Sequence, residues 1–240
     1  MKVCVVIPTY NNSGTVSDVI GAALRFCKDV LVVSDGADEA TRNAILEYGD
    51  RIIFIGYEPN RGKGYALKTA FRKARELGFD YAVTMDSDGQ HFADDIPVFL
   101  QAIENESGPL YVGSRALDAE NMPSGNTFAN KFSNFWFALQ TLHRIPDTQT
   151  GFRAYPLDRC VLPFSNRYEA ELEMLVLSAW KGVKIVPLKV KVYYAPEGER
   201  VSHFRKGKDF TRISILNTFL TLAAFVYGWP SMLFHKIAGR

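Results

Sequence analysis

The chain has 240 residues, of which 47% are hydrophobic and 22% are charged, a composition typical of an ordinary globular protein. The net charge is +2 at pH 7, which excludes the strongly basic field expected of a nucleic-acid-binding protein. The cysteines Cys4, Cys27 and Cys160 lack metal-ligand spacing, and their odd number favours reduced thiols in a cytosolic protein. This length allows one large domain, alone or with an appendage.

Apolar, β-branched runs alternate with segments whose apolar residues recur at helical spacing. The predicted strands are Val3–Ile7, Val30–Val33, Ile52–Ile55, Tyr81–Met85 and Leu110–Gly113, and the predicted helices cover 16–24, 40–46, 66–77 and 96–103. This alternation predicts an α/β fold in which helices cover both faces of a mostly parallel sheet.

The alternation weakens after Ser114. A polar loop is predicted for 117–126, helices for 128–142 and 168–180, and short strands for 185–186 and 190–194. No linker separates these segments. We therefore predict a catalytic domain over residues 1–200 and a basic, amphipathic, membrane-proximal segment over residues 201–240.

Two carboxylates one residue apart, Asp86 and Asp88, end the fourth predicted strand, and Gln90 and His91 follow them. Residues two apart in an extended segment point the same way, and two close like charges require a cation between them. Carboxylate and amide oxygens suit Mg²⁺ or Mn²⁺. The alternative is a solvated acidic turn, and His91 fits either a ligand or a structural histidine.

Polar residues also follow the other strands, and the carboxyl ends of parallel strands meet at one edge of a sheet, where ligands bind. Asn60–Gly64 is a glycine-rich entry to a helix, suited to an anion, with Lys63 adding charge. Asp35 can accept hydrogen bonds from a base or a ribose, and Tyr10 can stack on a base. Each also has a structural alternative: an ordinary helix entry for Asn60–Gly64, a turn for Asp35, and an aromatic that covers the sheet edge for Tyr10.

Arg115 follows the fifth strand, where an arginine can grip a phosphate or form a surface ion pair. The polar loop from Asp147 to Arg153 carries many hydrogen-bonding groups. Residues 213–234 contain no charge, and basic residues precede them. Their polar residues lie along one helical side, which favours a helix in the membrane interface over a soluble helix or a true span.

These motifs together resemble the family 2 glycosyltransferases of the GT-A fold, in the subgroup of dolichyl-phosphate mannosyltransferase-like enzymes and bacterial polyprenyl-phosphate sugar transferases. The matching segments occur in the family order and cover about two-thirds of the chain. They are Ile7–Asn12, Asp35–Gly36, Asn60–Gly64, Asp86–His91, Gly113–Arg115 and Asp147–Arg153. Two segments depart from the family pattern: Ser34–Ala37, and Ser124–Asn134, where Lys131 is the only basic residue.

The resemblance implies a role for each matching position. The donor-binding residues would be Pro8, Tyr10, Asp35, Lys63, Asp86 and Ser87, and the metal ligands Asp86, Asp88 and Gln90, holding Mg²⁺ or Mn²⁺ on a diphosphate. The acceptor side would include Arg115, Lys131, Ser133, Gln149 and Arg153. The catalytic candidates are Asp88, Asp147 and Glu171, the last two as alternative general bases if the acceptor is a hydroxyl.

The expected function is an inverting, metal-dependent transfer of a sugar from a GDP- or UDP-linked hexose to a membrane-associated acceptor. That acceptor would be a polyprenyl phosphate or a glycolipid, and the enzyme would be peripheral on the inner face of the cytoplasmic membrane. The alternatives are transfer to a saccharide hydroxyl in polysaccharide synthesis, a sugar nucleotidyltransferase, and a nucleotide-sugar-binding module without turnover.

Overall fold

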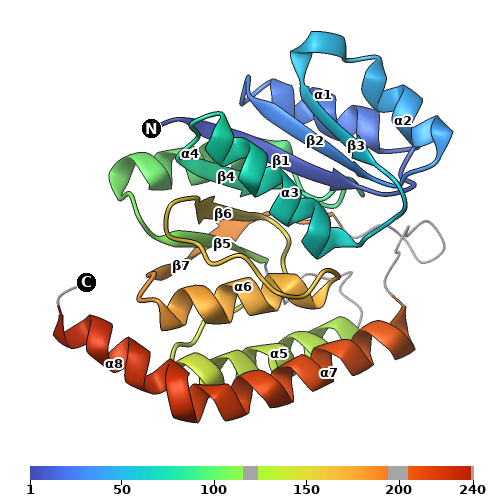
Figure 1. The fold of residues 1–240 in the computed structure, drawn as a ribbon. Coiled ribbons are helices and arrows are strands. Elements are labelled where there is room, and N and C mark those ends of the chain that lie inside the picture. The colour runs from blue at the N-terminus through green and yellow to red at the C-terminus, as the bar shows by residue number, and fades with distance from the viewer. Residues whose placement is uncertain (116–123, 194–204, 239–240) are drawn as a thin grey trace.

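The structure is a computed structural model that describes residues 1–115, 124–193 and 205–238. Its sheet has seven strands in the order β3-β2-β1-β4-β6-β5-β7 (Figure 1). The strands are β1 (Val3–Thr9), β2 (Val30–Asp35), β3 (Ile53–Tyr57), β4 (Tyr81–Thr84), β5 (Leu110–Arg115), β6 (Arg153–Pro156) and β7 (Ile185–Val190). β1 to β4 run parallel, β5 and β7 pair in parallel, and β6 is antiparallel to both of its neighbours. The predicted mostly parallel sheet is confirmed.

The helices are α1 (Val16–Leu24), α2 (Glu39–Leu46), α3 (Lys63–Glu76), α4 (Ile96–Asn105), α5 (Ser124–Thr141), α6 (Glu169–Trp180), α7 (Lys206–Ala223) and α8 (Trp229–Ile237). Alternate residues of β1 point to opposite faces of the sheet. Cys4 and Val6 join a core with α3, α5, α6 and α7, whereas Val5 and Ile7 join a core with α1, α2 and α4. Helices therefore cover both faces, as predicted.

Two sequence-based predictions differ from the structure. The sequence does not predict β6, because four residues between polar loops are too few to show the alternation of apolar and polar residues that indicates a strand. These residues form a strand because they pair with β4 and β5. The strand predicted for 190–194 is wrong: β7 ends at Val190, and Val192 forms only an isolated bridge to His91. Tyr194, most of the loop predicted for 117–126 and the predicted domain boundary at residue 200 lie outside the described residues.

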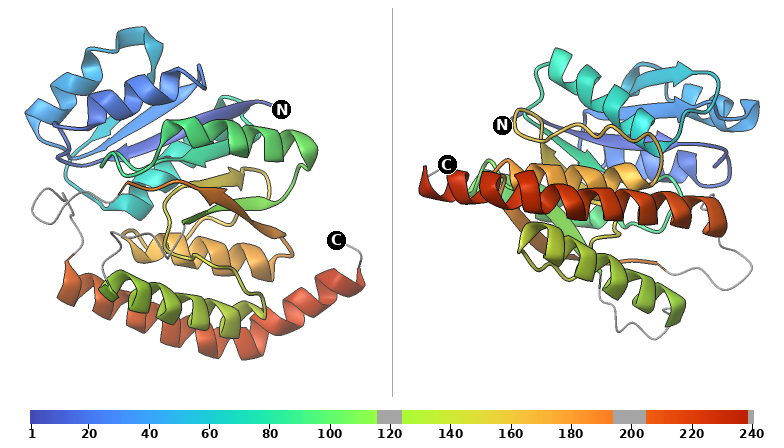
Figure 2. Two further views of the ribbon diagram at one scale, coloured as in Figure 1. Left: turned by 180° about the vertical axis from the view of Figure 1, so that it is seen from behind. Right: turned by 60° about the horizontal axis from the view of Figure 1, so that its bottom comes forward.

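The C-terminal helices lie beside α5 and beneath α6 (Figures 1 and 2). α7 continues through a π-helical turn, Ala224–Gly228, into α8. Gln140 of α5 donates its amide hydrogens to the Asn217 and Thr221 side chains, at 3.1 Å and 3.2 Å. Asn217 and Thr221 of α7 thus face the protein together with apolar residues such as Leu216 and Leu220. The opposite side of the helix, with Ile215, Phe219 and Leu222, is also apolar and is exposed.

The three cysteines are free thiols, as the sequence predicts. Cys4 and Cys160 are buried, and burial raises the pKa of the Cys4 thiol to about 12 and that of the Cys160 thiol to about 11. Neither is a reactive thiolate at neutral pH.

Candidate active site

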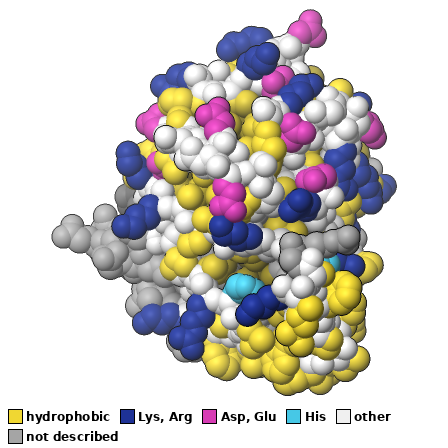
Figure 3. Space-filling view, turned by 90° about the vertical axis from the view of Figure 1, so that its left-hand side faces the viewer, with side chains coloured by type: hydrophobic (Ala, Val, Ile, Leu, Met, Phe, Trp, Pro, Cys, Tyr) yellow, Lys and Arg dark blue, Asp and Glu magenta, His cyan; other side chains and the backbone are white. Residues whose placement is uncertain are grey.

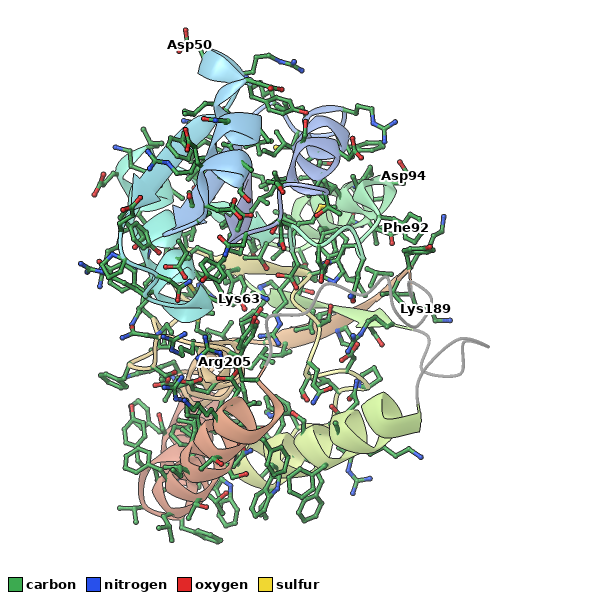
Figure 4. The ribbon with its side chains drawn as sticks, turned by 90° about the vertical axis from the view of Figure 1, so that its right-hand side faces the viewer. Asp50, Lys63, Phe92, Asp94, Lys189 and Arg205 are labelled. Carbon is green, nitrogen blue, oxygen red and sulfur yellow. The ribbon has the colours of Figure 1, made fainter. Side chains whose placement is uncertain are left out.

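The candidate site lies at the edge of the sheet where β1, β2, β4 and β5 end, the edge seen in Figure 4 with Lys63 near its centre. Parallel pairing of β1 with β2 and β4 brings these strand ends together. Asp35 ends β2, Asp86 and Asp88 follow β4, and Arg115 ends β5. The predicted convergence of polar loops at this edge is therefore what the topology produces.

Lys63, the first residue of α3, places its ammonium between two carboxylates. Its Nζ is 2.6 Å from Asp86 Oδ1 and 2.8 Å from Glu171 Oε2. Burial lowers the pKa of Lys63, but Asp86 and Glu171 outweigh it and raise that pKa well above the ordinary value. In the same way burial raises the pKa of Asp86 and the Lys63 charge brings it below its usual value. Lys63 is thus a fixed positive charge at the centre of the site.

The segment after Asp86 turns back on itself. The backbone N–H of Gln90 donates to Asp88 Oδ1 at 3.0 Å. Ser87 is buried, its Oγ accepting a hydrogen bond from Asn12 and its carbonyl one from Thr15 Oγ1. Burial and the neighbouring Asp86 charge raise the pKa of Asp88 to about 6. Two carboxylates that repel each other in a partly buried place favour a cation.

Asp35 is buried and organises the Asn60–Gly64 loop. Its carboxylate accepts hydrogen bonds from the backbone N–H groups of Arg61 at 2.7 Å and Gly62 at 2.8 Å, and from the Asn60 side chain at 3.0 Å. These hydrogen bonds give Asp35 a structural role at the end of β2 that requires no bound ligand. The role of Asp35 in holding the donor stays a prediction.

The glycines of this loop are needed for close packing against the start of α6. A Cβ added at Gly64 would lie 2.3 Å from the Ala170 Cβ, and one at Gly62 would lie 2.6 Å from the Asn166 carbonyl oxygen. Gly62 also has a φ of +101°. The loop and α6 therefore touch through their backbones, which brings Glu171 to Lys63.

Arg115 and Asp147 form an ion pair at the other end of the site. The Arg115 Nη2 donates to Asp147 Oδ1 at 2.9 Å and its Nε donates to Oδ2 at 2.5 Å, while Asn130 donates to Oδ1 at 2.8 Å. Asp147 is only 1% exposed. Burial raises its pKa, but hydrogen bonds from Arg115 outweigh this and leave the pKa below its usual value. A carboxylate so fully engaged is a poor proton acceptor, so the geometry favours Glu171 as the base candidate.

The predicted acceptor residues fall into two groups. Lys131 and Gln149 are exposed, and Arg115 is partly exposed beside Asp147. Ser133 is buried and accepts a hydrogen bond from Thr148 Oγ1 at 2.7 Å. Arg153 is 1% exposed and donates to the carbonyls of Thr148, Thr150 and Glu171. The structure thus gives Ser133 and Arg153 internal partners and does not bring them to an accessible surface.

His91 is buried beside the carboxylate pair and stacks on Phe152, with ring centroids 5.1 Å apart. Burial lowers its pKa to about 4, so the ring is neutral at pH 7. Its backbone bridges to Val192. These contacts fit the structural alternative for His91. Pro8 is buried at the end of β1, and Tyr10 is half-buried in the loop that follows.

Sequence reasoning missed three pairings in this site: Lys63 with Glu171, Asn12 with Ser87, and Asn130 with Asp147. The sequence indicates Glu171 only as a base candidate. Asn12 lies in a matching segment and Asn130 in one that departs from the family pattern. Parallel pairing of β1 with β4 brings Asn12 to Ser87, whereas the packing of α6 and α5 brings Glu171 to Lys63 and Asn130 to Asp147.

Comparison with known proteins identifies the family. The model described as "Glycosyl transferase family 2" matches residues 4–156, well over half of the chain. The chain belongs to glycosyltransferase family 2. The matched residues include the donor-side and carboxylate motifs described above.

Two relatives of the chain carry a lipid phosphate in their names. The chain is 30% identical over 212 residues to UDP-N-acetylglucosamine–dolichyl-phosphate N-acetylglucosaminyltransferase of Methanococcus voltae, covering 79% of this chain and 84% of that protein. It is 27% identical over 213 residues to undecaprenyl-phosphate mannosyltransferase of Micrococcus luteus, covering 83% and 86%.

One solved structure shows the shared GT-A fold. It is glucosyl-3-phosphoglycerate synthase from Mycobacterium tuberculosis, in complex with Mn²⁺, UDP-glucose and phosphoglyceric acid. The TM-score is 0.63 at 20% identity, over 93% of this chain and 79% of that one. The family 2 membership and this fold together establish a glycosyltransferase, and the predicted resemblance is confirmed.

Proposed function

We propose that this glycosyltransferase moves a hexose from a UDP- or GDP-linked donor to a polyprenyl phosphate at a membrane surface. The observation that carries the proposal is the Asp86–Asp88 carboxylate pair at the carboxyl end of β4. The positively charged side chain of Lys63 forms an ion pair with Asp86 there. The names of the two relatives supply the acceptor class.

A divalent ion fits the residues present. Asp86 and Asp88 offer carboxylates and Gln90 an amide, and Asp86 already takes a positive charge from Lys63. Among the described residues no group of three or more His, Cys, Asp or Glu could hold a metal ion. The proposed site therefore rests on two carboxylates and one amide, and Mg²⁺ can bind through one or two carboxylates when water and substrate phosphates complete its shell. When bound, the ion would neutralise the departing diphosphate.

The side chains of the site would supply charge stabilisation and, where one is needed, a proton acceptor. Lys63 adds fixed positive charge where negative charge develops on the leaving group. The acceptor oxygen attacks the anomeric carbon from the opposite face, which inverts its configuration. A phosphate acceptor is already anionic and needs no base. A hydroxyl acceptor would use Glu171, whose Oε1 is buried and has no hydrogen-bond partner among the described residues.

The membrane side of the proposal rests on the C-terminal helices. Gly207–Ile237 forms a helix of 31 residues that is long and apolar enough, by length and composition alone, to cross a membrane. Its polar side is bonded to α5, so we place it along the surface of the bilayer, with residues 1–200 as the catalytic domain and 201–240 as the membrane-proximal segment. The enzyme would act on the inner face of the cytoplasmic membrane.

A donor panel with membrane lipid extract tests the reaction. Purified protein is incubated with Mn²⁺ and labelled UDP- or GDP-hexoses, and label is followed into the organic phase. Label in that phase supports a lipid acceptor. Label only in soluble glycan would favour a hydroxyl acceptor, and donor binding without any turnover would favour a binding module.

The Asp88→Ala variant tests the carboxylate pair. We expect Mn²⁺-dependent transfer to fall by about 100-fold or more, because a metal's stabilisation of leaving-group charge is worth several kcal/mol. The control is Asp94→Ala, since Asp94 is exposed nearby and bears no assigned role (Figure 4). Full activity in Asp88→Ala, with an unchanged circular dichroism spectrum, would rule out the metal assignment.

A further inference from the structure

One oxygen of the Asp86 carboxylate is paired with Lys63, and the other packs close to Gly151. Lys63 Nζ lies 2.6 Å from Oδ1. Oδ2 lies against the backbone of Gly151, where an added Cβ would come within 2.4 Å of it. A divalent ion that binds Oδ1 would have to displace the ammonium, because two cations on one oxygen repel strongly in a partly buried place.

The stem of Lys63 is fixed and its head can move. Asp35 accepts the N–H of Gly62 at 2.8 Å, and the Asn166 carbonyl accepts the N–H of Tyr65 at 3.0 Å, so the backbone on both sides of Lys63 is held. The side chain beyond it is a flexible four-carbon chain carrying a point charge. Glu171 Oε2, 2.8 Å from Nζ, supplies a second partner that does not depend on Asp86.

We propose that Lys63 gates the metal site of this enzyme. In the donor-free protein its ammonium occupies the cation position on Asp86. With metal and donor bound, Asp86 would help to hold the metal, and Lys63 would turn to the diphosphate while Glu171 keeps its ammonium within reach. Glu171 is then a positioning residue that weakens the hold of Lys63 on Asp86. This inference rests on the proposed metal-assisted transfer.

The gate makes metal affinity in the absence of donor depend on both residues. Lys63→Met frees Asp86, so we expect Mn²⁺ to bind about tenfold more tightly, a size typical of contacting residues. Glu171→Gln leaves Lys63 with Asp86 as its only full charge partner, so Mn²⁺ should bind more weakly. In the Lys63→Met background, Glu171→Gln should change Mn²⁺ affinity little, because no ammonium is left to compete.

The experiment is a Mn²⁺ titration of the purified 240-residue protein, in which electron paramagnetic resonance reports the free ion, with and without UDP or GDP. It compares the wild type, the two single variants and the double variant, with Lys73→Met as control because Lys73 is a partly exposed lysine of the same helix that pairs with Glu76. Lys63→Gln, which removes the charge but keeps a polar group, replaces Lys63→Met if that variant does not fold.

Non-additive effects of the two substitutions, with the signs given above, support the gate. Additive effects would show that Lys63 and Glu171 act only through their separate charges, and would overturn the gate while leaving the metal assignment intact. Failure of the wild type to bind Mn²⁺ with or without either nucleotide would overturn the metal assignment and the gate together.

Discussion

Asp147 shows how one buried carboxylate organises the part of the site that we propose for the acceptor. It accepts hydrogen bonds from Arg115, from the Asn130 side chain and from the Gln149 backbone at 3.0 Å. An ionised carboxylate this well hydrogen-bonded stays ionised despite its burial. Arg115 is correspondingly held in place by Asp147, so any phosphate that it contacts meets an oriented guanidinium.

We expect Asp147→Asn to lower the free energy of unfolding at pH 7 by about 3 kcal/mol, because it leaves Arg115 without its counter-charge. The folded pKa of Asp147 lies below its unfolded value of about 3.9, so its stabilisation is present above that pH and is lost as the pH falls through the folded pKa. The difference between wild type and variant in urea denaturation should therefore hold from about pH 8 to 5 and shrink at lower pH.

The control for this measurement is Asp158→Asn, since Asp158 and Arg159 form an exposed pair 3.8 Å apart. Such surface pairs contribute little, so stability should barely change. A wild-type advantage over Asp147→Asn that grew towards acid pH would contradict the assignment.

At the scale of elements, the contact between α3 and α6 sets the geometry of the site. Lys63 begins α3 and Glu171 lies in the first turn of α6, and these side chains meet only because small residues line the contact. Gly64 packs directly against Ala170. The glycine-rich sequence that suggested phosphate binding thus has a structural reason of its own.

We expect Gly64→Ala to destabilise the fold by about 1–3 kcal/mol, because the new Cβ would overlap Ala170 and force the helices apart. The matched control is Gly14→Ala, where an added Cβ would meet nothing within 4 Å. Thermal unfolding followed by circular dichroism compares the two variants. Equal melting temperatures for both would show that α3 and α6 can separate freely.

At the scale of the whole molecule, apolar side chains gather on the base formed by the C-terminal helices and α5 (Figure 3). Their exposed members include Phe132, Phe135, Ile215, Phe219, Leu222, Phe225, Val226, Leu233, Phe234 and Ile237. Val226 is 84% exposed and Phe219 67%. An apolar surface of this extent marks an interaction site, and a bilayer fits the basic residues that precede it.

We expect the Phe219→Glu/Val226→Glu double variant to bind vesicles of mixed phosphatidylcholine and phosphatidylglycerol about tenfold or more weakly, since each buried apolar side chain contributes about 1.5–3 kcal/mol. Co-sedimentation measures the bound fraction. Leu46→Glu is the control, because Leu46 is an exposed leucine of α2, far from this base (Figure 1). Unchanged vesicle binding by the double variant would remove the C-terminal helices from the proposed membrane surface.

The sequence determined the parts of the molecule whose causes are local. Buried parallel strands such as β1 and β2 need continuous apolar runs, and α3 needs an apolar stripe, so both are visible in the residues themselves. The order of strands and helices then brings Asp35, Asp86 and Arg115 to one edge, and the ordered motifs identify the family.

Only the tertiary structure decided what those residues touch. Four residues became the antiparallel strand β6 because β4 and β5 offered open edges on either side. Asn217 and Thr221 face inward, where Gln140 of α5 donates hydrogen bonds to them beside the packed Leu216 and Leu220, and the apolar residues on the other side of α7 are exposed. Lys63 met Glu171, 108 positions along the chain, because two glycines let α6 approach. Contacts between residues so distant depend on packing, which no local pattern encodes.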